Sequence, residues 1–138
     1  MEQIAHPNKT GRIIGWVLSI IVILFLLFDV FGKFAQPEEV IKGTMDLGYP
    51  QSSITLLGTL LLICTLLYAF PKTALLGAVL LTAYLGGAVA THVRVENPLF
   101  SHILFPVYLG ILLWLGLYLR SIKLQRLVKG EPKSNVSY

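Results

Sequence analysis

Long apolar stretches without Asp, Glu, Lys or Arg dominate the hydrophobicity pattern of this chain. They cover residues 13–28, 47–71, 73–93 and 97–119. A helix needs about 17–25 such residues to cross a bilayer, and the first stretch reaches that length only when it is extended past Asp29. Polar residues do not recur at every third or fourth position, as they would in a soluble bundle. The pattern therefore predicts an all-α, four-helix transmembrane bundle that forms one membrane domain over residues 1–138.

Turn-forming residues separate the apolar stretches and indicate where the helices end. They are Gly48-Tyr49-Pro50, Pro71 and Asn97-Pro98. The turn at Pro71 is so short that the second and third spans are expected to form an antiparallel hairpin. We expect spans at about 13–33, 52–70, 73–93 and 100–120, followed by a basic C-terminal tail at 121–138.

The basic residues are distributed unequally between the two sides that this topology defines. One side has eight of the 11 Lys and Arg residues and the other side has three. Because cytoplasmic loops carry the excess of basic residues, both termini are expected in the cytoplasm. The eight are Lys9, Arg12, Lys72, Arg120, Lys123, Arg126, Lys129 and Lys133, and the three are Lys33, Lys42 and Arg94.

Composition agrees with a protein whose main partner is the lipid bilayer. Hydrophobic residues make up 55% of the chain and charged residues 13%, about half the charged share of a soluble domain. The sequence pI of 9.3 comes from the basic residues that set the orientation in the membrane, so no nucleic-acid partner is expected. A lone cysteine, Cys64, rules out an intramolecular disulfide or a dithiol redox pair.

Ionisable residues from three of the predicted spans meet at the outer end of the bundle. Asp29 is still inside the hydrocarbon, where an acid costs about 2.5–3.5 kcal/mol on insertion scales and usually faces a partner. Tyr84 lies about 16 Å into the third span and is expected to face the bundle interior. The expected ligand-binding pocket consists of Asp29, Lys33, Tyr84, His92, Arg94 and His102.

Two roles are open for Asp29. It precedes Lys33 by four residues on one helix face, which favours a local ion pair with the lysine extending to the interface. Alternatively, it accepts hydrogen bonds from His92 or His102 and so organises a polar pocket. The two histidines lack the spacing of a zinc site, so no metal is expected.

Small residues recur every four positions in the third span and predict close helix packing. One stripe consists of Ala83, Gly87 and Thr91, and the other consists of Thr82, Gly86 and Ala90. The glycines expected to serve the same contacts in the second and fourth spans are Gly58, Gly110 and Gly116.

Residues 64–94 and 97–120 carry a resemblance to a known family. They read CTLLYAFPKTALLGAVLLTAYLGGAVATHVR and NPLFSHILFPVYLGILLWLGLYLR, and they resemble the DoxX-like family of small bacterial integral membrane proteins. The resemblance extends over about residues 12–126. It implies a four-helix bundle in the bacterial inner (cytoplasmic) membrane. The family takes its name from a subunit associated with thiosulfate:quinone oxidoreduction, and it supplies no catalytic residues to carry over.

These observations favour a protein that binds a small lipophilic molecule with a polar head, for which a quinone is a candidate, as an accessory subunit of a redox complex. A membrane or periplasmic protein partner is then expected. One alternative is a membrane-embedded oxidoreductase or isomerase that acts on a lipid-like substrate. Another is a purely structural membrane subunit. The catalytic residues and any resident cofactor are unknown at this point, since the chain has no Rossmann glycine motif and no haem signature.

Overall fold

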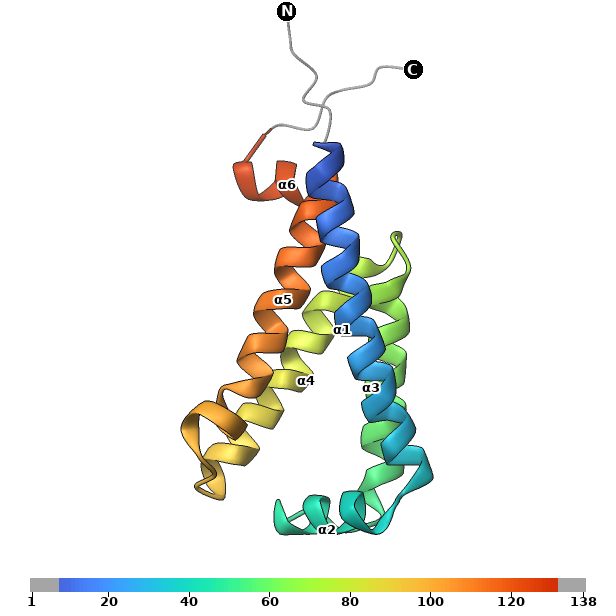
Figure 1. Cartoon of the computed structure of the whole chain (residues 1–138), viewed down its shortest axis with the longest axis vertical. Helices are drawn as coiled ribbons and strands as arrows, with labels where there is room; N and C mark the ends of the chain where they lie inside the picture. Colours follow the sequence, from blue (N-terminus) through green and yellow to red (C-terminus); the bar gives the residue numbers. More distant parts are fainter. Residues whose placement is uncertain (1–7, 132–138) are drawn as a thin grey trace, which may run out of the picture.

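The computed structural model describes residues 8–131, and its regular elements are all helices (Figure 1). Within these residues, three segments are long and apolar enough to cross a membrane: α1 (Lys9–Ala35), α4 (Ala74–Arg94) and the continuous segment Leu99–Arg120. That segment consists of a π-helical turn, η1 (Leu99–Ile103), and α5 (Phe105–Arg120), which has Pro106 in its first turn. A shorter apolar helix, α3 (Ser53–Ala69), has 17 residues.

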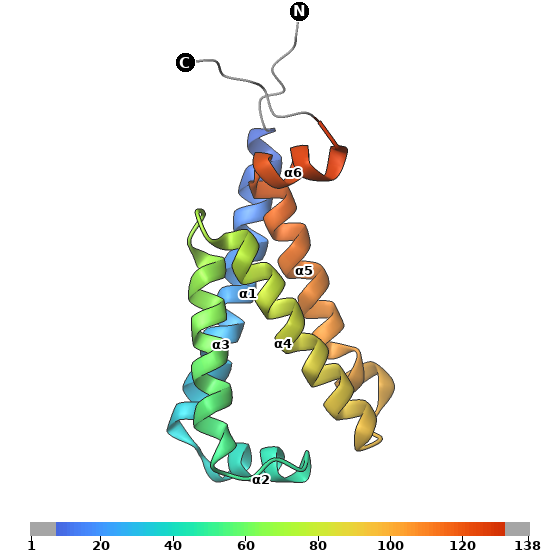
Figure 2. The same ribbon diagram turned by 180° about the vertical axis from the view of Figure 1, so that it is seen from behind.

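The four long helices form two pairs that separate toward one end of the molecule. Helix α1 packs against α3 and α5, and α4 packs against the same two neighbours. Figures 1 and 2 show the helices converging where α1 begins and α5 ends, which we name the closed end. Toward the other end, the open end, the α1–α3 pair separates from the α4–α5 pair.

Glycines allow the backbones to meet at the closed end. A Cβ atom on Gly15 of α1 would lie 2.8 Å from the carbonyl oxygen of Gly116 in α5. A Cβ atom on Gly77 of α4 would lie 2.2 Å from the backbone nitrogen of Tyr68 in α3. Real Cβ atoms do not approach backbone atoms so closely, so both helix contacts depend on the absence of a side chain.

A buried polar network joins the helices at the same end. The Tyr68 hydroxyl donates to the carbonyl oxygen of Leu113 at 2.7 Å and lies 3.1 Å from the Ser19 hydroxyl. Arg120 donates to the Tyr68 carbonyl oxygen at 2.9 Å. Because Ser19 and Tyr68 are fully buried, these bonds replace the water that the polar groups have lost.

The predicted packing role is wrong for Gly86 and Gly87 in α4 and for Gly110 in α5. Cβ atoms on Gly86, Gly87 and Gly110 would meet no described atom within 4 Å. These glycines lie where the helix pairs have separated, so no neighbouring backbone is present to approach. Close packing is confirmed for Gly116 and for Gly58, whose Cβ would lie 3.0 Å from the Lys33 Cβ.

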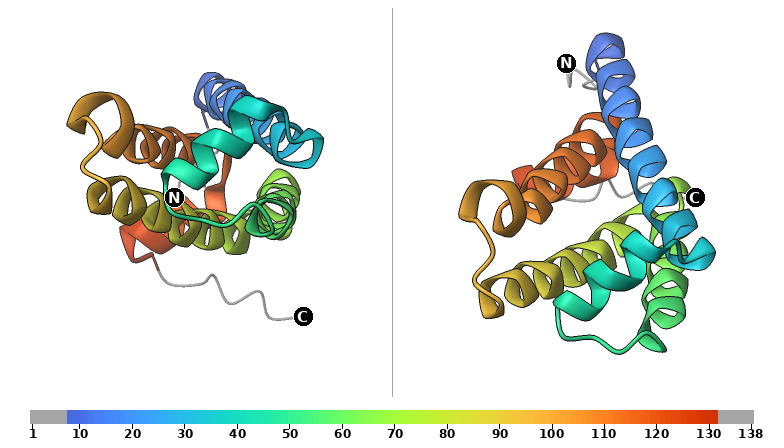
Figure 3. Two further views of the ribbon diagram at one scale, coloured as in Figure 1. Left: turned by 90° about the horizontal axis from the view of Figure 1, so that it is seen from below. Right: turned by 60° about the horizontal axis from the view of Figure 1, so that its bottom comes forward.

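Two short helices, α2 (Glu38–Asp46) and α6 (Ile122–Lys129), lie in segments that were expected to be a loop and a tail. Gln36 ends α1 in the left-handed conformation, with φ 50°. Pro37 then precedes α2, whose first turn has Glu38 and Glu39 at the positive end of the helix dipole. None of the α2 residues is buried, and the helix lies across the open end (Figure 3).

Candidate functional site

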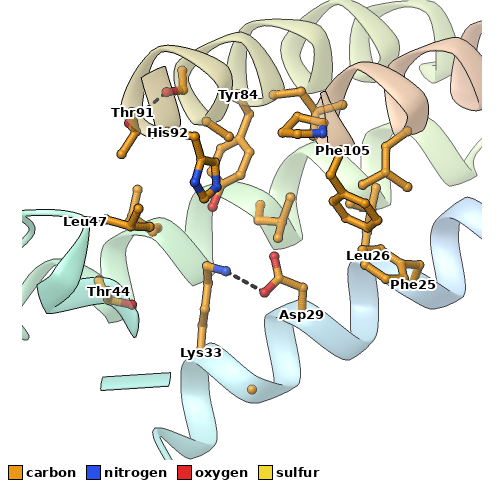
Figure 4. A pocket seen from close by; sticks show the side chains of 18 of the residues that line it. Phe25, Leu26, Asp29, Lys33, Thr44, Leu47, Tyr84, Thr91, His92 and Phe105 are labelled. Atoms are coloured by element: carbon orange, nitrogen blue, oxygen red, sulfur yellow. Dashed lines mark hydrogen bonds and ion pairs between the residues drawn. The ribbon is translucent and has the colours of Figure 1, made fainter. Parts of the chain in front are cut away.

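A cavity of about 580 Å³ lies between the two helix pairs on the side of the open end (Figure 4). Every long helix contributes side chains to its wall, and α2 contributes Val40 and Thr44. Its apolar lining residues are chiefly Phe25, Leu26, Leu61, Leu85, Phe105 and Leu109. Its polar lining comes mainly from the ends of α1 and α4 that are nearest α2, so the cavity combines an apolar interior with a polar rim.

Asp29 and Lys33 form an ion pair on the cavity wall. The Lys33 Nζ lies 2.6 Å from the Asp29 Oδ1, and the side chains are 17% and 42% exposed, respectively. Of the two expected roles for Asp29, the local pair is therefore the one formed. No hydrogen bond joins Asp29 to either histidine within residues 8–131, and the Nδ1 atoms of both rings bond to nearer neighbours. The second carboxylate oxygen of Asp29 is left to accept from another group.

A neighbouring amide determines which nitrogen of His92 carries the hydrogen. The Asn97 Nδ2 lies 2.7 Å from the His92 Nδ1. An amide nitrogen can only donate, so Nδ1 accepts and the neutral ring carries its hydrogen on Nε2. His92 lines the cavity, and its Nε2–H group has no partner among residues 8–131, so it can donate to a bound molecule.

Tyr84 faces the bundle interior, as predicted from its depth in the span. It lines the cavity, and its hydroxyl has no hydrogen-bond partner among the described residues. Figure 4 shows Tyr84 and His92 extending from α4 toward the Asp29–Lys33 pair on α1. These four side chains, which come from helices far apart in the sequence, therefore surround one space.

A second, more polar cavity of about 460 Å³ adjoins the first. Asp29, Lys33 and His92 line both cavities, so they form the boundary between them. His102 lines only the second cavity, where its ring meets the His92 ring edge-on at a centroid distance of 5.8 Å. Asp46, at the end of α2, also lines this second cavity.

Arg94 is the one predicted site residue that lines neither cavity. Its guanidinium group donates instead to the carbonyl oxygen of Leu47, directly after α2. Nearby, the Tyr49 hydroxyl lies 3.0 Å from the Thr91 hydroxyl. Arg94 and Thr91 thus attach the end of α2 to α4. A cation at a helix C-terminus also interacts favourably with the helix dipole.

Three lining residues from the α2 segment were missed from the sequence: Val40, Thr44 and Leu47. They recur at the i, i+4 and i+7 positions of a helix. That periodicity is the signal that could have revealed an amphipathic helix facing the bundle.

Replacing Arg94 by alanine is expected to release the end of α2. A hydrogen bond from a charged donor contributes about 1.5 kcal/mol, so amide hydrogens of residues 38–49 should exchange roughly tenfold faster. Hydrogen exchange with peptide-level readout measures this. Lys42→Ala is the matched control, because Lys42 is an exposed cation on α2 itself. Equal exchange in the two variants would contradict the assigned role of Arg94.

The lining groups indicate the chemistry that the cavity suits. Tyr84, His92 and Lys33 offer hydrogen-bond donors, and Asp29 offers an acceptor, while the ion pair is neutral overall. Among residues 8–131, no group of three or more His, Cys, Asp or Glu side chains is arranged to hold a metal ion. The arrangement suits an apolar molecule whose uncharged head both donates and accepts hydrogen bonds.

Comparison with known proteins supports the assignment to a family. No curated protein and no solved structure matches the chain. A family model described as the DoxX-like family matches residues 17–116, and this range includes every residue that lines the two cavities. The chain therefore belongs to the DoxX-like family, and its long apolar helices identify it as a multi-pass membrane protein.

Proposed function

We propose that this protein binds a small lipophilic molecule with an uncharged polar head in the cavity at its open end. The observation that carries the proposal is the unused hydrogen-bonding capacity of three polar side chains, Tyr84, His92 and Asp29, that face an otherwise apolar cavity. Polar groups at membrane depth are costly unless they find partners, and such residues usually mark a functional path or site. A bound head group would supply partners for the Tyr84 hydroxyl, the His92 Nε2–H and the second Asp29 oxygen, which have none among residues 8–131.

The proposal includes four membrane crossings with both termini in the cytoplasm of a bacterium. Helix α3, with 17 residues, is about 25 Å long and can cross a thinned or locally adapted bilayer. Because α1 begins and α5 ends at the closed end, the number of crossings must be even. The distribution of basic residues then assigns the closed end to the cytoplasm and the open end to the outside of the inner membrane.

A quinone is the candidate ligand that this arrangement favours. Its carbonyl oxygens would accept hydrogen bonds from Tyr84 and His92, and the hydroxyls of the reduced form would donate to Asp29. Phe25 and Phe105, whose ring centroids are 5.4 Å apart, lie on the apolar wall between α1 and α5. A tail that passed them would reach the surrounding lipid. In this role the protein would deliver or hold a quinone as an accessory subunit of a redox complex.

The test is ligand-dependent thermal stabilisation of the purified protein by decylubiquinone, with decylbenzene as the probe that lacks oxygen. At a concentration of 100 times Kd, the quinone should add about 2.7 kcal/mol to the free energy of unfolding. His92→Ala should weaken the binding of decylubiquinone roughly tenfold, because it removes a directed hydrogen bond to a carbonyl oxygen. Asp29→Asn should weaken the binding of the reduced form, decylubiquinol, roughly tenfold, because it removes the charged acceptor of the quinol hydroxyl.

Asp46→Asn is the matched control, since Asp46 lines only the second cavity and should leave binding unchanged. Stabilisation that persists in both Asp29→Asn and His92→Ala, or that decylbenzene gives equally, would refute the proposed site.

The shared boundary between the two cavities favours a second candidate, a membrane-embedded oxidoreductase or isomerase. Asp29, Lys33 and His92 adjoin both an apolar and a polar space, so they could exchange protons between a lipid-like substrate and water. Flavin or haem absorbance in the purified protein would support the redox form. Loss of turnover of a lipid-like substrate in His92→Ala, without loss of binding, would support catalysis.

A further inference from the structure

Helix α6 lies across the closed end and does not continue the direction of α5 (Figures 1 and 2). The Ser121 hydroxyl caps its first turn by accepting from the Leu124 amide at 3.3 Å. The Gln125 side chain donates to the carbonyl oxygen of Tyr118 at 2.7 Å. Leu124 packs into the core with only 7% of its surface exposed. These contacts, at both the backbone and the core, determine the direction in which α6 leaves the bundle.

An apolar stripe on α6 continues past the edge of the bundle. Leu124, Leu127 and Val128 are at the i, i+3 and i+4 positions and so share one helix face. Leu124 is buried, whereas Leu127 and Val128 are 67% and 66% exposed. Because Leu124 faces the core of the bundle, the two exposed residues face the same way. They are therefore turned toward the lipid that would surround α5 and not toward the cytoplasm.

The rest of the α6 surface is basic. Lys123, Arg126 and Lys129 are its charged residues, and it has no acid. By contrast, α2 at the open end has three acids, Glu38, Glu39 and Asp46, and one lysine. The basic surface of α6 adjoins exposed apolar side chains, and this combination is complementary to anionic phospholipid head groups. The acidic α2 at the open end does not have this complementarity.

We propose that α6 is an interfacial anchor that binds anionic phospholipids. Leu127 and Val128 enter the boundary between head groups and acyl chains, while Lys123 and Lys129, which flank the apolar stripe, contact the phosphates. The proposal does not depend on a ligand in the cavity between the helix pairs, since α6 contributes no residue to that cavity.

The test places an environment-sensitive fluorophore on the full chain by Val128→Cys in a Cys64→Ala background. The labelled protein is reconstituted into phosphatidylcholine vesicles or into an equal mixture of phosphatidylcholine and phosphatidylglycerol. In each case one lipid class carries a nitroxide quencher near its head group. Arg126→Cys provides the matched control position, because Arg126 is on the opposite face of the helix.

We expect strong quenching at position 128 and weak quenching at position 126. In the mixture, nitroxide-labelled phosphatidylglycerol should quench position 128 several-fold more than labelled phosphatidylcholine does. Replacing both Lys123 and Lys129 by glutamine should abolish this preference, so that the two labelled lipids quench position 128 equally.

Three results would overturn the proposal. The first is a label at position 128 that is exposed to water. The second is equal quenching by the two lipid classes in the chain that retains both lysines. The third is a label shielded from both water and lipid, which would show that another protein, or a second copy of this chain, covers the stripe.

Discussion

Gly77→Ala is expected to destabilise the protein severely, lowering its free energy of unfolding by about 3 kcal/mol or more. The new Cβ atom would lie 2.2 Å from the backbone nitrogen of Tyr68 and 2.5 Å from its Cα. These are backbone atoms of α3, close to the turn that joins α3 to α4, so they cannot turn aside as a flexible side chain would. The two helices would have to separate, and the buried bonds of the Tyr68 hydroxyl would be lost with them.

Gly86→Ala is the matched control for this substitution. It adds the same methyl group to the same helix at a position where no described atom lies within 4 Å. Alanine is also more favourable than glycine inside a helix by about 1 kcal/mol, so this variant should be neutral or slightly more stable. Thermal unfolding of the purified proteins in detergent measures both effects. Equal unfolding midpoints for the two variants would show that the α3–α4 contact is not as close as described.

Gly87→Trp is expected to abolish ligand binding while leaving the fold intact. Gly87 lines the cavity, and its Cβ would point into open space. An indole ring at this position fills part of the space that a head group would occupy. Because no neighbouring backbone has to move, the unfolding midpoint without ligand should change little. The affinity for decylubiquinone should fall at least tenfold, which corresponds to about 1.4 kcal/mol.

Gly86→Trp again provides the control, because Gly86 is adjacent in sequence but does not line the cavity. A tryptophan there adds the same bulk outside the cavity lining and should leave quinone affinity as it is in the unmodified chain. Binding measured by thermal stabilisation or by tritiated ligand separates the two variants. If both bind equally well, the ligand does not occupy this cavity, whatever the effect of substitutions at Asp29 and His92.

The membrane-spanning helices were predictable because their signal is local. A run of uncharged apolar residues indicates a span regardless of what surrounds it, and the observed α4 differs from the predicted span 73–93 by one residue at each end. Helices α2 and α6 were not recognised, since nine and eight residues are too few to form a span. Such short helices persist through contacts with the ends of the bundle and with an interface, which the sequence does not display.

The candidate site was predictable where the depth of a residue in the membrane determines its neighbours. The direction of each span determines which end of the molecule its residues reach, and this brought Asp29, Tyr84 and His92 together correctly. Arg94 was misplaced because a long side chain at a helix end can turn either way, and here a carbonyl group of the α2 segment attracts it.

The glycine stripes were misread for a related physical reason. Small residues permit the approach of a neighbouring helix, but they do not supply that neighbour. In α4, Gly77 meets α3, whereas Gly87 lies beyond the point where the helices separate. Here the absence of side chains creates volume for a cavity, and no pattern within a single helix distinguishes this from close contact.

The separation of the helix pairs gives the molecule unequal cross-sections in the two leaflets of the bilayer. In the proposed orientation, the narrow closed end occupies a small area of the inner leaflet and the open end a larger area of the outer one. Lateral pressure in the outer leaflet would therefore press the helix pairs together and favour a smaller cavity volume. Lipids that crowd that leaflet would reduce the space between α1 and α4, and lipids that relax it would enlarge that space. Membrane tension thus becomes a variable that acts on the site without contacting it.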